Sequence, residues 1–132
     1  MSKSNYLEDK VNDHVLGGPD FTRPATVYVA LFTAAPNDAG GGTEVTGGSY
    51  ARKDVTNNDT NWPASSSGVK ANGTDIVFAT PTADWGTVTH FGIFDAVTAG
   101  NLLYWGALAS SKVVQSGDPT KFPAGDLTVT ED

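Results

Sequence analysis

The sequence contains no cysteine, which excludes disulfide bonds, thiolate metal sites, iron–sulfur clusters and cysteine nucleophiles. Basic residues are scarce: 8 Lys and Arg stand against 15 Asp and Glu, so the net charge is -7. Binding to nucleic acid or to an anionic membrane needs clustered cations, so this balance argues against both partners. The charged fraction is only 17%, and with 15 glycines this is typical of a β-rich protein with many loops.

Long hydrophobic runs are also missing. The longest is Val27–Phe32, far shorter than a segment that spans a bilayer. The polar residues after Met1 do not resemble a signal peptide, so we expect the protein to be made in the cytoplasm. A length of 132 residues, with no linker or internal repeat, predicts a single domain over 1–132.

One short helix is predicted near the N-terminus, over 4–17. Asn5 is a suitable capping residue, and Glu8 follows three residues later as in a capping box. Gly17 and then Pro19 end the helical pattern. We expect this helix to precede a β-domain over 25–132.

The helix has a single narrow apolar stripe. Leu7, Val11 and Val15 recur at a spacing of four residues. A helix this short is marginal alone and needs a surface to pack on. That surface is either the protein's own domain or a neighbouring subunit, and the stripe gives three candidate interface residues.

The rest of the chain shows alternating or short buried apolar patterns, which are typical of strands. Both faces of the strongest strand, 26–33, are apolar, so both are expected to be covered. Strands 88–95 and 102–108 are expected to form a hairpin. The spacing predicts an all-β fold, an antiparallel β-sandwich or jelly-roll-like arrangement of seven to eight strands. The expected strands are 26–33, 50–56, 74–79, 88–95, 102–108, 113–114, 120–122 and 127–129.

The polar stretch 57–73 is long for a loop in a compact domain, which indicates a functional, interface or mobile loop. It contains Trp62, a further candidate interface residue. The tryptophans and neighbouring tyrosines allow a sugar-stacking platform or, alternatively, anchors in a core or an interface. These aromatic residues are Tyr50, Trp62, Trp85, Tyr104 and Trp105.

Chemistry-bearing patterns are sparse. The two histidines, His14 and His90, do not fall at metal-ligand spacing, and no G-x-S-x-G motif is present. No pair of carboxylates is singled out for glycoside hydrolysis. The sequence therefore predicts a protein that is not an enzyme and that holds no metal or cofactor.

Six blocks of the sequence carry a family resemblance: 4–8, 25–33, 42–52, 83–95, 100–108 and 122–127. Together they resemble a family of small proteins of tailed bacteriophages and prophages, usually labelled phage tail fibre protein. The resemblance covers nearly the whole chain, and the blocks 85–95 and 102–108 are its most specific parts. It implies a structural protein of the virion.

The protein is also similar to the small β-sandwich modules with which phages decorate capsids, commonly as trimers. The expected function is therefore a capsid decoration (cement) protein, a homotrimer that stabilises the head through contacts with the major capsid protein or another virion protein. Avidity would make such a trimer effective. The alternative is a tail fibre or receptor-binding component that contacts the host surface. Both alternatives place the protein in the virion.

Overall fold

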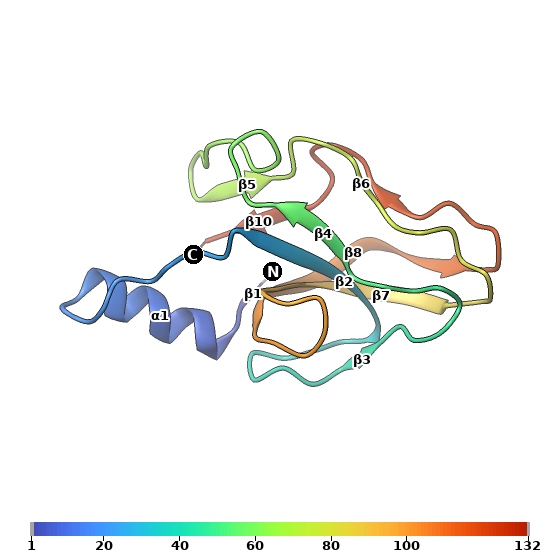
Figure 1. The fold of residues 1–132 in the computed structure, drawn as a ribbon, viewed down its shortest axis with the longest axis horizontal. Coiled ribbons are helices and arrows are strands. Elements are labelled where there is room, and N and C mark those ends of the chain that lie inside the picture. The colour runs from blue at the N-terminus through green and yellow to red at the C-terminus, as the bar shows by residue number, and fades with distance from the viewer. Residues whose placement is uncertain (1, 132) are drawn as a thin grey trace.

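The computed structural model describes residues 2–131, which form one helix and ten strands (Figure 1). The predicted fold class, mostly antiparallel β with one short N-terminal helix, is confirmed. No helix within 2–131 has the length and apolar character needed to cross a membrane. The elements are β1 (Ser2–Lys3), α1 (Asn5–Val15), β2 (Thr26–Ala34), β3 (Thr43–Glu44), β4 (Lys53–Thr56), β5 (Val69–Ala71), β6 (Ile76–Val77), β7 (Gly86–Phe94), β8 (Leu102–Val114), β9 (Lys121–Phe122) and β10 (Thr128–Thr130).

The main sheet has six strands, in the order β1-β8-β7-β2-β3, and β4 also pairs with β2. β7 and β8 pair antiparallel and form the predicted hairpin. β2 pairs antiparallel with β7 on its other side, so that Leu31 lies opposite Phe91. The two nine-residue strands β2 and β7 thus lie together near the centre of the sheet.

Both faces of β2 are covered, as predicted. Val29 and Leu31 point to one face and are 0% and 1% exposed, while Phe32 on the other face is 2% exposed. Two small sheets, β5 with β10 and β6 with β9, supply side chains to the first face. The ring of Phe91 in β7 lies 6.1 Å from that of Phe122 in β9. The hydrophobic core therefore lies between the main sheet and the two small sheets.

The helix, Asn5–Val15, lies within the predicted range 4–17, but its capping residue differs from the predicted one. Ser4, not Asn5, is the capping residue, because its Oγ accepts a 3.2 Å bond from the Leu7 N–H. The same hydroxyl donates to the Leu102 carbonyl in β8. The Asn5 N–H, which Glu8 was expected to satisfy in a capping box, donates instead to the Asp38 carbonyl at 2.8 Å.

Several predicted strand boundaries are wrong. The strand expected over 50–56 begins at Lys53, and the one expected over 74–79 shrinks to Ile76–Val77. The segments 102–108 and 113–114 belong to one strand, β8, with an irregularity where Val88 pairs with Lys112 but His90 with Ala107. The pairing with β7 skips residues 108–111, so a bulge joins the two predicted segments into one strand.

The stretch 57–73, expected to be a loop, contains β5 and is tied to the rest of the chain. Asn72 is 2% exposed, and its Nδ2 donates to the carbonyls of Thr74 and Pro123. Its Oδ1 accepts a 2.9 Å bond from the Leu127 N–H. One buried amide therefore connects this stretch to the turn before β10.

Candidate functional site

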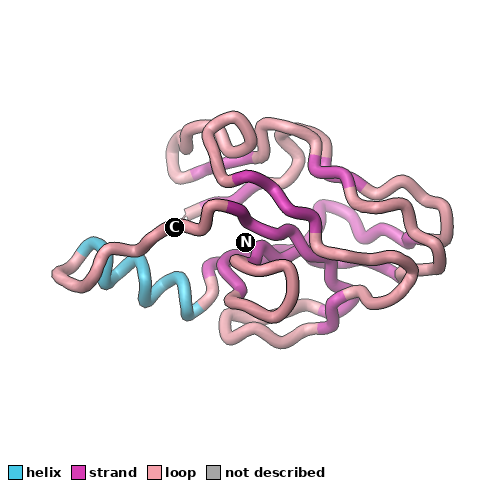
Figure 2. The backbone as a smooth tube through the Cα atoms, in the orientation of Figure 1, coloured by secondary structure: helices cyan, strands magenta, loops and turns pink. Residues whose placement is uncertain are grey.

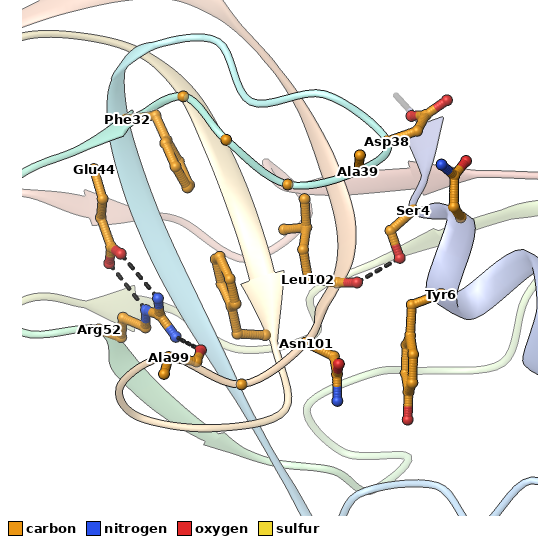
Figure 3. Close-up of a pocket in the computed structure, with 16 residues that line it drawn as sticks. Ser4, Tyr6, Phe32, Asp38, Ala39, Glu44, Arg52, Ala99, Asn101 and Leu102 are labelled. Carbon is orange, nitrogen blue, oxygen red and sulfur yellow. Dashed lines mark hydrogen bonds and ion pairs between the residues drawn. The ribbon is translucent and has the colours of Figure 1, made fainter.

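A large hollow lies on the second face of the main sheet, the face of Phe32 (Figure 3). We call it the Arg52 hollow. It has a volume of about 590 Å³ and lies between the first turn of α1, the loop 38–42 and the end of the β7–β8 hairpin. Phe32 and Phe94 stack beneath it with ring centres 6.2 Å apart. Its apolar floor is therefore supplied by the two central strands.

A bidentate ion pair between Arg52 and Glu44 closes one end of the hollow. Arg52 donates from Nε and Nη2 to the two carboxylate oxygens of Glu44, each at 2.9 Å. Its Nη1 donates to the carbonyls of Ala96 and Ala99 in the hairpin turn. The Arg52 side chain is only 8% exposed. One guanidinium thus fixes β3 and the hairpin turn relative to each other.

Tyr50 extends this network into the core. Its hydroxyl donates to Glu44 at 2.7 Å and accepts a 3.0 Å bond from the Leu31 N–H. Burial raises the pKa of the Tyr50 phenol, because the ionised form would lose its hydration. Trp85 holds the Tyr50 ring edge-on at 5.3 Å. Glu44 is therefore held by both a cation and a neutral donor.

The other end of the hollow is polar and more open. Asp38 Oδ1 accepts bonds from the Ser2 hydroxyl at 2.6 Å and the Trp105 indole N–H at 2.9 Å. These two bonds hold the pKa of Asp38 below its usual range, the Ser2 bond most strongly. Tyr6 and Asn101 stand at this end, as Figure 3 shows.

Glycine is required where the loop 38–42 closes over the sheet edge. Gly42 has a φ of +74°, and a Cβ atom there would lie 2.8 Å from the Ala34 carbonyl and 2.7 Å from the Pro36 nitrogen. A side chain at this position would both strain the backbone and push the loop outward. The run of glycines thus allows the rim to lie close to β2.

The chemistry of the Arg52 hollow suits a neutral polar ligand. Its volume lies within the ~300–1,000 Å³ of small-molecule sites. Glu44 neutralises the charge of Arg52, so this cation is not offered to an anion. The polar end combines a carboxylate, Asp38, with the amides of Asn5 and Asn101. Within residues 2–131 no group of three His, Asp or Glu side chains is placed to hold a metal.

The four predicted interface residues lie elsewhere, and their environments differ. Leu7 and Trp62 are buried in the chain's own core, at 5% and 7% exposed. Both line a second, smaller hollow. Val11 is partly buried against the core, whereas Val15 is 67% exposed. The structure thus brings Leu7 and Trp62 together, and the interface role of all four stays a prediction.

The interpretation of the aromatic residues as core anchors is confirmed for Trp62 and Trp85, which belong to the hydrophobic core. Trp85 also donates from Nε1 to the Gly48 carbonyl at 2.9 Å. Trp105 lies on the second face near His90, with ring centres 6.2 Å apart. These tryptophans do not form one stacking platform.

No binding role was predicted from the sequence for the residues of the Arg52 hollow. Tyr50 and Arg52 are two residues apart in the predicted strand 50–56, and side chains at that spacing lie on the same face of a strand. This spacing was the available signal that the two residues lie together. Their partner Glu44 lies in a strand of two residues, too short for a pattern to reveal. Asp38 and Asn101 lie in turns, where Asp and Asn are common because their side chains bond to the nearby backbone.

Comparison with known proteins adds one match over nearly the whole chain. A family model described as Podophage GP4 fiber I protein gp80 matches residues 2–130. A search of curated proteins finds no match. The description of the matching family is that of a fibre protein, so the predicted capsid decoration role, with its contacts to the major capsid protein, is wrong. The match supports the alternative, a tail fibre component.

Proposed function

The chain belongs to the family of Podophage GP4 fiber I protein gp80, and from this premise we propose that it is a non-catalytic fibre subunit that contacts the host cell surface. Fibre proteins are components of the virion, and a fibre subunit assembles with other fibre or virion polypeptides. The homotrimer predicted from the sequence stays a prediction. The Arg52 hollow is the observation that carries the proposed contact with the host.

We assign to this hollow a neutral saccharide of the cell surface. A sugar ring presents hydroxyl groups at its rim and carbon-bound hydrogens on its faces. Asp38, Asn5 and Asn101 offer the hydrogen-bonding groups, and Leu102 and the partly buried Phe94, one face of which Arg52 covers, offer apolar surface. Side-chain amides and carboxylates both match hydroxyl groups, because between them they donate and accept.

Preorganisation supports this assignment. The bonds from Arg52 to Glu44, Ala96 and Ala99 hold one end of the hollow, and those from Ser2 and Trp105 to Asp38 hold the other. A site whose walls are already fixed loses little entropy on binding. Such a site suits weak contacts that a fibre repeats across many subunits.

Competition for adsorption tests the proposal. The purified protein, added to host cells before the phage, should lower the rate of adsorption. The double variant Asn5→Ala/Asn101→Ala should compete at least tenfold less well, while Gln115→Ala, an exposed amide away from the hollow, should compete like the wild type. Thermal melting checks that the variants are folded. If the double variant competed as well as the wild type, the hollow would not be part of the contact with the host. If the wild type did not compete at all, host binding by this subunit would be contradicted.

A further inference from the structure

Helix α1 and the returning segment 16–25 form an arm that extends beyond the strands (Figures 1 and 2). Of the helical residues only Leu7 is buried. Val15 is 67% exposed and Leu16, the residue that ends the helix, is 79% exposed. These are the two most exposed large hydrophobic side chains of the described residues. The apolar stripe of the helix therefore starts in the core and ends in solvent.

The end of the arm has a defined conformation. Gly17 adopts a φ of +84°, and the Gly18 N–H donates to the Asp13 carbonyl at 2.7 Å, which closes the helix. The Phe21 N–H donates to His14 Nδ1 at 3.0 Å and so fixes the returning segment. These two hydrogen bonds fix the end of the helix, where Val15 and Leu16 face solvent. We call the segment 13–20 the arm tip.

The charge of the arm tip is negative on balance. Asp13 and Asp20 flank the apolar pair, and the Asp20 side chain is 92% exposed. His14 Nδ1 lies 3.8 Å from Asp20 Oδ1. The final carbonyl groups of a helix also carry a partial negative charge. The arm tip therefore presents an apolar pair flanked in sequence by two carboxylates.

The second hollow has the complementary character. It has a volume of about 210 Å³, and we call it the Trp62 hollow. Its walls include Trp62 and the aliphatic side chains Leu7, Val27, Ile93, Leu103 and Val129. Arg23 and Lys70 also line it, and neither forms an ion pair within residues 2–131. Trp62 Nε1 is buried with no hydrogen-bond partner in the same range.

We propose that the arm tip of one copy of the chain seats in the Trp62 hollow of a second copy. The apolar pair Val15 and Leu16 would fill the apolar walls, and the acidic rim of the tip would face Arg23 and Lys70. This inference rests on the proposed function, since it names a partner for a subunit that assembles into a fibre. Basic residues are few in a chain of net charge -7, and two that form no ion pair within residues 2–131 line this hollow.

The same chain cannot supply its own tip. Leu7 lies in the wall of the hollow, and Leu16 stands about 13 Å further along the helix axis, at 1.5 Å per residue. The contact is therefore between copies, and it joins two different surfaces. Repetition of such a head-to-tail contact gives a closed ring or a filament rather than a two-fold dimer.

Sedimentation of the purified chain tests the contact. The wild type should show a mass that rises with concentration. The variant Val15→Asp/Leu16→Asp should remain monomeric, because both changes lie on the exposed tip and leave the core intact. Val113→Asp replaces a similarly exposed valine, 59% exposed on β8, and should associate like the wild type. Tip variants that associate normally, or a wild type that stays monomeric at every concentration, would overturn the proposal.

A mixing experiment tests the head-to-tail geometry. Arg23→Glu/Lys70→Glu reverses the charge of the hollow and should weaken self-association at least tenfold. This variant has an intact tip, and the tip variant has an intact hollow, so a mixture of the two should form one-to-one heterodimers. No heterodimer would overturn the proposal. None of these outcomes bears on the fibre location, which labelling of virions tests separately.

Discussion

The guanidinium carbon of Arg52 lies 3.6 Å from the centre of the Phe94 ring, directly over the floor of the larger hollow. The same group holds Glu44 with two bonds and the hairpin turn with two more. A cation above an aromatic ring gains further electrostatic stabilisation. This single side chain therefore connects β3 with the end of β7 and the hairpin turn that follows it, and the shape of the hollow depends on it.

Replacement of Arg52 by alanine should lower the free energy of unfolding by about 3 kcal/mol, because it leaves the partly buried Glu44 without its cation. Arg52→Lys should recover only part of this loss, since an ammonium group cannot form the fork with Glu44 and reach both carbonyls. Urea denaturation measures both values. Full recovery with lysine would show that charge alone matters.

The neighbouring Lys53 provides a matched control for the charge change. Lys53 pairs with Asp54 at 3.6 Å, and both side chains are well exposed, at 41% and 70%. Exposed pairs contribute little, so Lys53→Ala should change stability by less than about 0.5 kcal/mol. A large loss in this variant would mean that removal of any cation near β4 is destabilising.

Trp62 should behave as a core residue. Trp62→Ala should cost about 3–5 kcal/mol, as for other large buried aromatic residues. Trp62→Phe should cost much less, because it keeps most of the buried surface and removes an indole N–H without a partner in the described chain. Thermal melting distinguishes the two. An unchanged melting temperature for the alanine variant would show that the side chain is exposed in solution.

Asn72 should be hard to replace. Asn72→Ala removes the acceptor of the buried Leu127 N–H and the donors to the Thr74 and Pro123 carbonyls. Each buried group left without a partner costs about 1–3 kcal/mol. The variant should therefore be strongly destabilised, and hydrogen exchange should rise first in 57–73 and 123–130. Exchange that rises uniformly would contradict the local role.

Alkaline pH should destabilise the fold through tyrosine. Burial first, and then Glu131, raise the pKa of Tyr104 to about 12. An unfolded tyrosine ionises near pH 10, so the stability from this group is complete below pH 10 and is lost between about pH 10 and 12. Because Tyr104 is only half-buried, the loss should be less than ~1.4 kcal/mol per pH unit. Denaturation at pH 9.5 and 11 should show a shallower decline for Tyr104→Phe than for the wild type, and equal slopes would exclude Tyr104.

The sequence predicted the features that depend on local patterns. Alternation and apolar runs located β2, β7 and the first half of β8, because these strands are buried on at least one face along their length. The apolar spacing of four residues and the stop at Gly17 located α1 to within two residues at each end. The capping residue was missed because Ser4 is selected by its bond to Leu102, which is distant in sequence.

The site depended on contacts that no local pattern contains. Glu44 and Arg52 meet because β3 and the residues before β4 return to the same part of the sheet. Whether the side chains of Leu7 and Val15 are buried in the core or exposed could also be decided only from the structure. The same stripe is buried at one end and exposed at the other, since the helix extends past the edge of the sheet.

The location of the chain in the virion tests the central claim most directly. Intact phage particles should be labelled with gold-conjugated antibody raised against the purified chain and viewed by electron microscopy. A fibre subunit predicts gold at the fibres of the tail and none over the faces of the head. Gold distributed over the head, or absent from intact particles that carry fibres, would contradict the account.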